Sequence, residues 1–212
     1  MKLLTEFVGS FLFMLIIALA AVSGSPLTPL AIGGALMTMV YMGGHVSGGH
    51  YNPAVSLGVL LRGKMESKDF VPYVVAQVLG GVAAFSVGWW LTGKTPGIAP
   101  GEGVGIAQAV VNEMLFTLML VLTVLNVATH KKTEGNSFYG LAIGFVIVVA
   151  ATAAGGISGG AFNPAVGTGA TAAKAMMDGG SWSSLWIYWV GPLIGGGLAA
   201  LIFKAQGGES AE

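Results

Sequence analysis

The tripeptide Asn-Pro-Ala occurs twice in this chain, at residues 52–54 and 163–165, and each copy lies in a similar frame. The two frames read HVSGGHYNPAVSLG (45–58) and GISGGAFNPAVGTG (156–169), and they align without gaps. Asparagine is a good helix N-cap, and proline fits the first helical position. The sequence therefore predicts two short helices, each preceded by flexible Gly-Gly backbone, and with them an internal duplication of the fold.

The composition predicts an all-α membrane protein. Hydrophobic residues make up 54% of the chain and charged residues only 8%, against roughly 25% charged residues in a soluble domain. Crossing a bilayer takes about 20 apolar residues. We predict six transmembrane helices, at Leu3–Val22, Leu27–Met42, Phe70–Leu91, Ala107–Ala128, Phe138–Ala154 and Trp182–Phe203.

Two further apolar segments, Pro53–Leu61 and Pro164–Met176, follow the Asn-Pro-Ala copies but are too short to cross. We predict that they are re-entrant half-helices. Non-helical backbone at membrane depth is tolerated only where protein buries it or where it lines a wet cavity. The Gly-rich stretches before the two motifs therefore predict a polar pore or site.

The whole chain, 1–212, is predicted to form a single transmembrane domain with two repeats, at about 1–92 and 107–204. Glu6 in the first span matches Glu113 in the fourth, and AQVLGGVAA from Ala76 resembles GPLIGGGLAA from Gly191. Each repeat holds three spans, and because three is odd the second repeat must be inverted. An inverted repeat brings the two half-helices in from opposite faces, so that their N-termini meet near the midplane.

The positive-inside rule sets the expected orientation. With both termini in the cytoplasm, seven of the nine basic residues lie inside. The inner set is Lys2, Arg62, Lys64, Lys68, Lys131, Lys132 and Lys204, and the outer set is Lys94 and Lys174. Short loops and a compact length are typical of prokaryotes, so we expect a multi-pass protein of a prokaryotic inner membrane.

These features together closely resemble the aquaporin (major intrinsic protein) family, and the resemblance covers essentially the whole chain. The motifs that carry it are the paired Asn-Pro-Ala loops, the SGGHYNPAV segment and the glutamates of spans one and four. The resemblance implies an aquaporin fold, a passive channel and a homotetramer with one pore per subunit. The pore motif would be Asn52, Pro53, Ala54, Asn163, Pro164 and Ala165.

Physical chemistry agrees with that mechanism. Two helix N-termini, each with about half a positive charge, would oppose cations at mid-membrane, and the amides of Asn52 and Asn163 can donate hydrogen bonds into the lumen. The resemblance further implies that Glu6 and Glu113 support the loops, whose backbone carbonyls accept hydrogen bonds from the transported molecules. These carbonyls would belong to Gly48, Gly49, His50, Tyr51, Gly159, Gly160, Ala161 and Phe162.

The chain departs from the family pattern at the outer constriction. An Arg usually follows the second motif, but Val166 stands there, and alignment from the motifs places Ile32, Ala151 and Gly160 at the other three positions. We expect a wide, apolar outer selectivity filter at these four residues. The glycerol-conducting branch often has Asp after the Arg, and Gly167 stands there, so no motif argues for glycerol.

We therefore predict a passive channel for water and small uncharged solutes, with ammonia, urea, glycerol and peroxide as candidates. Its partners would be the lipid bilayer and these solutes, with no nucleic acid, cofactor or metal. An enzyme is not expected, because the chain has no cysteine and no nucleophilic or metal-ligand cluster. The alternative is a proton-coupled secondary transporter that uses Glu6 and Glu113, since acidic residues inside a membrane often have a functional role.

Overall fold

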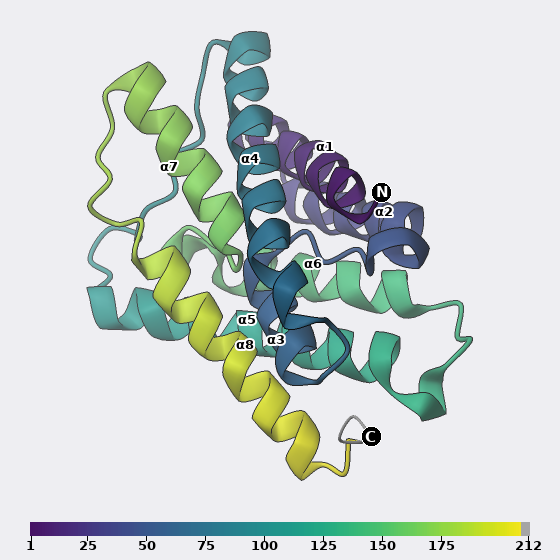
Figure 1. Ribbon diagram of the computed structural model, residues 1–212. Helices are drawn as coiled ribbons and strands as arrows, with labels where there is room; N and C mark the ends of the chain where they lie inside the picture. The colour runs from purple at the N-terminus through teal and green to yellow at the C-terminus, as the bar shows by residue number, and fades with distance from the viewer. Residues whose placement is uncertain (209–212) are drawn as a thin grey trace.

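Eight α-helices and one 3-10 turn form the molecule (Figure 1), whose computed structural model describes residues 1–208. Residues 209–212 of the predicted domain lie outside the described part. The elements are α1 Lys2–Ser23, α2 Thr28–Ser47, α3 Pro53–Leu61, α4 Ser67–Thr92, α5 Ile106–Thr129, η1 Lys131–Thr133, α6 Tyr139–Ser158, α7 Pro164–Asp178 and α8 Ile187–Ala205.

Six of these helices, α1, α2, α4, α5, α6 and α8, are long and apolar enough to cross a membrane. The two short helices, α3 and α7, begin at the prolines of the two motifs. The predicted fold class, six spans plus two half-helices, is confirmed. No strand occurs within residues 1–208.

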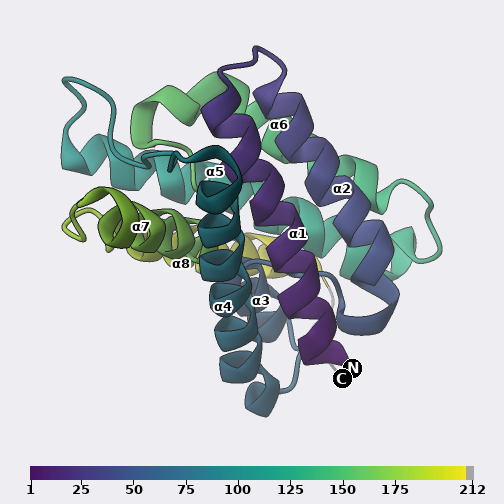
Figure 2. The ribbon, with the colours of Figure 1, turned by 90° about the horizontal axis from the view of Figure 1, so that it is seen from above.

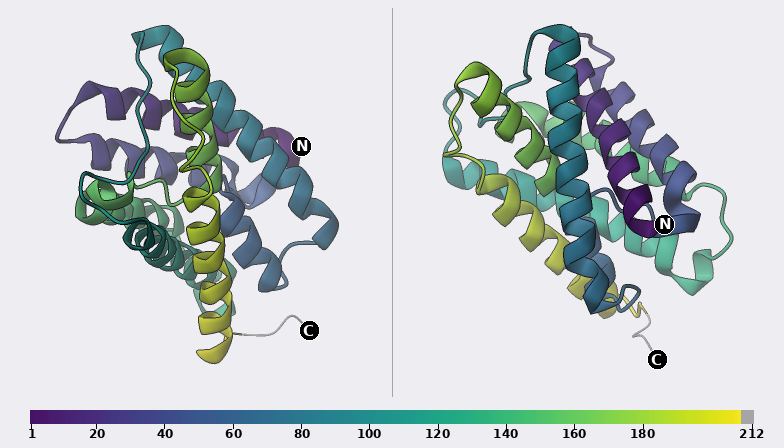
Figure 3. Two further views of the ribbon diagram at one scale, coloured as in Figure 1. Left: turned by 90° about the vertical axis from the view of Figure 1, so that its left-hand side faces the viewer. Right: turned by 45° about the horizontal axis from the view of Figure 1, so that its top comes forward.

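The helix pairs follow the repeat. In the first half α1 packs against α4 and α2, and Figure 2 shows α1 between these two helices. In the second half α5 packs against α8 and α6 in the same way, and α2 packs against α6 across the halves. The half-helices α3 and α7 lie toward opposite ends of the molecule (Figures 1 and 3) and contact each other.

Three predicted boundaries were wrong. Helices α2 and α6 continue through their Gly-Gly pairs and end only at Ser47 and Ser158. The capping residues that follow, Gly48 and Gly159, take left-handed backbone with φ of 94° and 92°. Helix α8 begins at Ile187 rather than Trp182. The preceding turn is polar: the Ser181 hydroxyl accepts a hydrogen bond from the backbone N–H of Ser183, an alternative to helix that serine favours.

The half-helices cross over to the opposite repeat. The backbone of Ala54 lies against Gly196 of α8, and the backbone of Ala165 lies against Gly81 of α4. A Cβ on Gly196 would come within 2.6 Å of the Ala54 carbonyl oxygen, and one on Gly81 within 2.8 Å of that of Ala165. Only glycine allows this approach, so these glycines fix the depth at which the two motifs meet.

Candidate functional site

Strained backbone leads into both motifs. Tyr51 and Phe162 have φ values of 48° and 50°, which are unfavourable for bulky side chains. Such residues cost about 1–3 kcal/mol each and persist only where their surroundings hold them. The two loops therefore need strong external support, which each half provides in the same way.

A buried carboxylate supplies this support in each half. In the first, Glu6 accepts hydrogen bonds from the backbone N–H groups of His50 (3.0 Å) and Tyr51 (2.8 Å) and from the Ser47 hydroxyl (2.6 Å). Glu6 and its counterpart in the second half, Glu113, are both fully buried.

In the second half, Glu113 accepts from the N–H groups of Ala161 (3.0 Å) and Phe162 (2.5 Å) and from the Ser158 hydroxyl (2.6 Å). Every donor position repeats the first half. All the carboxylate contacts thus serve to hold the loops.

The sequence reasoning missed the tyrosines that complete these supports. The Tyr73 hydroxyl donates to the Ser47 carbonyl (2.8 Å), and the Tyr188 hydroxyl donates to the Ser158 carbonyl (2.7 Å). The repeat could have revealed them, because each tyrosine lies three residues before the start of a matched segment, AQVLGG from Ala76 or GPLIGG from Gly191.

A side-chain network found only in the first half was also missed. Gln77 donates to Glu6 (2.8 Å) and to the Ser56 hydroxyl (3.0 Å), which in turn is hydrogen-bonded to the His50 ring at 3.0 Å. The corresponding residues of the second half are Pro192, Gly167 and Ala161, none of which has a polar side chain. The first loop therefore has a side-chain network, through Gln77, Ser56 and His50, that these positions cannot form in the second half.

The two motif asparagines bond to each other's loops. Each caps its own helix, with its side-chain oxygen accepting from the N–H of Ala54 or Ala165 at 2.9 Å. The Asn52 amide donates to the carbonyl of Phe162 (3.0 Å), and the Asn163 amide donates to that of Tyr51 (2.9 Å).

These cross-bonds take up part of the donor capacity of the two amides. One N–H of each amide joins the halves, and since a carboxamide has two, one N–H remains for the lumen. The carbonyls of Tyr51 and Phe162 likewise keep one lone pair each.

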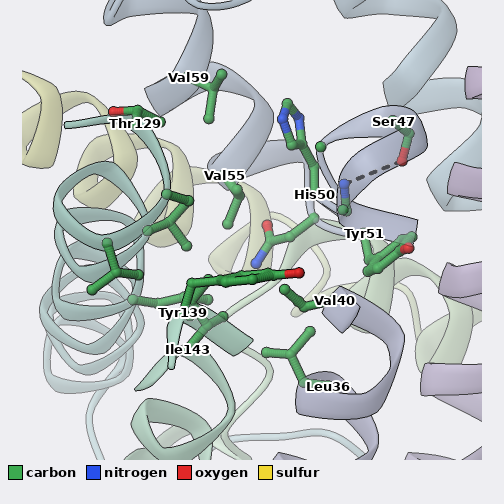
Figure 4. A pocket seen from close by; sticks show the side chains of 18 of the residues that line it. Leu36, Val40, Ser47, His50, Tyr51, Val55, Val59, Thr129, Tyr139 and Ile143 are labelled. Carbon is green, nitrogen blue, oxygen red and sulfur yellow. Dashed lines mark hydrogen bonds between the residues drawn. The ribbon is translucent and has the colours of Figure 1, made fainter. Parts of the chain in front are cut away.

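A cavity of about 1180 Å³ reaches both asparagines. It runs from a charged mouth, lined by Lys2, Lys64 and Glu66 among others, past apolar walls from α2, α3, α5 and α6. Figure 4 shows Val55 and Val59 of α3, Leu36 and Val40 of α2, and Ile143 of α6 in these walls, with the Tyr139 ring among them. No motif in the sequence singled out Tyr139, which lies at the start of α6.

Most of the predicted pore residues line this cavity. Among the loop residues these are Gly48, Gly49, His50, Tyr51, Gly160, Ala161 and Phe162, and beyond them the cavity reaches Ile32 and Ala151. Three of the four predicted filter positions therefore line the cavity. Gly159, Val166 and the prolines and alanines of the two motifs do not line it, and Val166 is 2% exposed.

The charged residues sort to two ends of the molecule. At the mouth of the cavity Lys2 lies 3.9 Å from Asp69, and Lys68 pairs with Glu66 at 2.7 Å. This pairing holds the pKa of the exposed Glu66 carboxyl below its ordinary value. Arg62 differs from its neighbours, because it is buried with its guanidinium carbon 5.0 Å from the centre of the Phe203 ring.

At the opposite end, Asp178 ties the loop between the halves to α7. Its carboxylate accepts from the Thr95 hydroxyl and pairs with Lys174 at 3.1 Å. These contacts hold the pKa of Asp178 below its ordinary value, the Thr95 hydrogen bond contributing most. Farther along, the Gly101 N–H donates to the Ile157 carbonyl at 2.9 Å, so the loop covers the end of α6.

Replacing Asp178 by alanine is expected to loosen this loop. Because the folded pKa is lowered, the tether is intact above the ordinary aspartate pKa of about 3.9 and is lost as pH falls through the folded value. Backbone hydrogen exchange of residues 94–101 should be faster in Asp178→Ala than in the parent at neutral pH. In the parent, the loop should lose its protection only in acid, once the Asp178 carboxylate is protonated. Glu102→Ala, at an exposed site in the same loop, should leave exchange unchanged, and an equal effect of both variants would contradict the tether.

Comparison with known proteins identifies the family. The family model for the major intrinsic proteins matches residues 1–203. The chain belongs to the major intrinsic protein family.

Major intrinsic proteins from plants and animals show this likeness along nearly the whole chain. Aquaporin TIP2-1 of Arabidopsis thaliana is 37% identical, with 94% of this chain and 84% of the relative covered. Aquaporin-8 of Rattus norvegicus is also 37% identical, with 94% and 78% covered. The structure of the aquaglyceroporin from Plasmodium falciparum superposes with a TM-score of 0.85 at 23% identity, covering 95% of this chain and 94% of that one, which shows the shared fold.

Membership of this family and the fold agree on the kind of activity. The protein is an integral, multi-pass membrane protein and a passive channel for water and small uncharged solutes.

Proposed function

We propose that this channel has a wide, apolar outer filter that admits small uncharged solutes such as ammonia, urea and peroxide besides water. The supporting observation is the side-chain chemistry of the four filter positions, Ile32, Ala151, Gly160 and Val166, which offer no charge and no hydrogen-bonding side chain. Three of them, Ile32, Ala151 and Gly160, line the same cavity as Asn163. Small residues at Ala151 and Gly160 leave room for solutes larger than water.

Selection against ions then falls to the motif region. The half-helices α3 and α7 direct their N-termini toward each other, and each terminus carries about half a positive charge. A cation there meets repulsion after losing part of its hydration, whereas a neutral molecule can accept from the free N–H of Asn52 or Asn163. Passage is diffusive and involves no chemical step, so we assign no enzymatic activity.

We assign to Glu6 and Glu113 the support of the loops rather than proton coupling. Three donors from the local loop and helix end meet each carboxylate, and Gln77 adds a fourth at Glu6. A proton carried by either group during transport would displace these contacts.

The proposed setting is a homotetramer with both termini in the cytoplasm of a prokaryotic cell. The separation of basic residues between the two ends of the molecule supports this orientation. Large exposed apolar side chains such as Leu12, Leu79 and Phe145 offer surface to lipid or neighbouring subunits. Short loops and compact length support the prokaryotic setting, and native mass spectrometry of the detergent-solubilised protein tests the tetramer.

The test of the filter is stopped-flow permeability of reconstituted vesicles, with water, ammonia, urea, glycerol and peroxide measured in parallel. We expect flux of ammonia, urea or peroxide well above that of protein-free vesicles. A channel that conducts water alone would contradict the wide filter.

The substitution Val166→Arg restores the residue that usually follows the second motif and is expected to narrow the range of solutes. An arginine side chain adds bulk and a fixed charge, so urea and ammonia flux should fall more than water flux. Equal passage of the larger solutes through both forms, in vesicles with equal amounts of folded protein, would show that Val166 does not face the filter.

A further inference from the structure

The two loops are tied to their preceding helices by different side chains. In the first half the Tyr51 hydroxyl donates to the Met39 carbonyl of α2 at 3.0 Å. The counterpart of Tyr51, 111 residues later, is Phe162, which has no hydroxyl. The second half must hold the end of α6 in another way.

Local packing explains the difference. A Cβ on Gly43 would lie 2.0 Å from the Tyr51 hydroxyl oxygen and 2.6 Å from the Thr5 methyl. The hydroxyl therefore fills space that exists only because residue 43 is glycine. The corresponding residue of the second half is Ala154, whose methyl takes the equivalent space and excludes a hydroxyl at residue 162.

Asn112 supplies the missing tether. It directly precedes Glu113, as Thr5 precedes Glu6, and it is buried. Its amide donates to the Ala154 carbonyl (3.2 Å) and to the Ser158 hydroxyl (2.8 Å). Thr5 instead bonds within its own helix, to the Met1 carbonyl. The two halves thus fill the same space with different side chains. The first half uses Thr5, Gly43 and Tyr51, and the second uses Asn112, Ala154 and Phe162.

The clamped segment carries two of the proposed filter positions. Ala151 lies one turn before Ala154, and Gly160 follows Ser158 by two residues, with its N–H donating to the Ser158 hydroxyl at 3.2 Å. Between them lie Gly155 and Gly156, whose absent side chains would meet nothing within 4 Å. A helix end with two adjacent glycines has low intrinsic stability, so its position depends on contacts from outside.

We propose that Asn112 is a positioning residue for the outer filter. By clamping the last turn of α6 from α5, it holds Ala151 and Gly160 in place, the task that the Tyr51 hydroxyl performs for α2. The proposal rests on the proposed function only in placing the filter at Ala151 and Gly160.

The test replaces Asn112 by threonine, the residue of the first half, and measures urea and water permeability in the same vesicles. Asn126 is a matched control, because it lies on the same helix and, within residues 1–208, its side-chain amide donates only to the Leu122 carbonyl of that helix. We expect Asn112→Thr to change the urea-to-water ratio by roughly threefold or more, because it removes the two buried hydrogen bonds that the amide makes to the end of α6. Asn126→Thr should keep the parent ratio. Hydrogen exchange at Gly159 and Gly160 should also speed up only in Asn112→Thr.

A triple variant tests the same idea by transplantation. In N112T/A154G/F162Y the second half carries the side chains of the first, and the new tyrosine hydroxyl should reach the Ala150 carbonyl, the counterpart of Met39. We expect it to restore the parent permeability ratio and the slow exchange. If Asn112→Thr alone does not fold, a folded triple variant with the parent ratio still supports the proposal.

Three results would count against it or against the filter, and they differ from one another. A parent channel that conducts water but no larger solute contradicts the wide filter. In that case hydrogen exchange at Gly159 and Gly160 still tests whether Asn112 holds the end of α6. Equal ratios and equal exchange in Asn112→Thr and Asn126→Thr overturn the positioning role. A triple variant that does not fold, or that folds without restoring ratio and exchange, overturns the equivalence of the two tethers.

Discussion

Replacing Glu113 by leucine is expected to abolish the folded channel. The change leaves the Ser158 hydroxyl and the N–H groups of Ala161 and Phe162 without their acceptor inside the protein. Each buried unsatisfied group costs about 1–3 kcal/mol, and the strained backbone of Phe162 would lose the acceptor of its N–H group. Thermal unfolding of the detergent-solubilised protein, followed by size-exclusion fluorescence, should show a large loss of melting temperature or no folded peak.

The milder change Glu113→Gln keeps one acceptor oxygen and should give a smaller loss of stability. Vesicles with equal amounts of folded Glu113→Gln protein should conduct solute down its gradient, with no dependence on a pH gradient. Glu102→Gln, at an exposed site in the loop between the halves, serves as the control and should match the parent. Proton-driven solute accumulation in the parent that Glu113→Gln abolishes would instead establish the coupled transporter.

Replacing Ala151 by phenylalanine is expected to close the outer filter to larger solutes. Ala151 lines the cavity, on the side of α6 that faces it. A benzyl group in place of a methyl adds bulk at a point where Ile32 and Gly160 also meet the cavity. Urea flux should fall at least tenfold and water flux less, since a smaller molecule needs less room.

Ala153 provides a matched control for that experiment. It lies two residues further along α6 and is exposed on the outside of the helix bundle, so Ala153→Phe adds the same bulk toward lipid. Its solute and water fluxes should match the parent. If Ala151→Phe also leaves urea flux unchanged, the filter lies elsewhere in the cavity, and Tyr139 would be the next residue to replace.

The sequence determined the architecture because the signals for it are local and repeated. Apolar segments of membrane-spanning length, asparagine caps before prolines, and matched glutamates predicted six spans and two half-helices. The odd number of spans in each repeat then required inversion. The matched segments that contain Gly81 and Gly196 also supported the duplication, and small residues of this kind allow close approach of membrane helices.

What the sequence could not give depends on contacts between residues far apart in the chain. The end of α6 at Ser158 follows from the loop geometry rather than from hydrophobicity, which drops earlier at Gly155. The burial of Arg62 against Phe203 joins residues 141 positions apart, and no local pattern predicts it.

The same reason governs the asparagines of the motifs. Their type and spacing predicted two helix caps, and both caps are present. Each amide also uses one of its two N–H donors to bond to the opposite loop. This contact arises only because the inverted repeat brings the two halves together. Composition and periodicity thus determined the channel fold, whereas tertiary packing decided how Glu113, Asn112 and Asn163 share the available donors and acceptors.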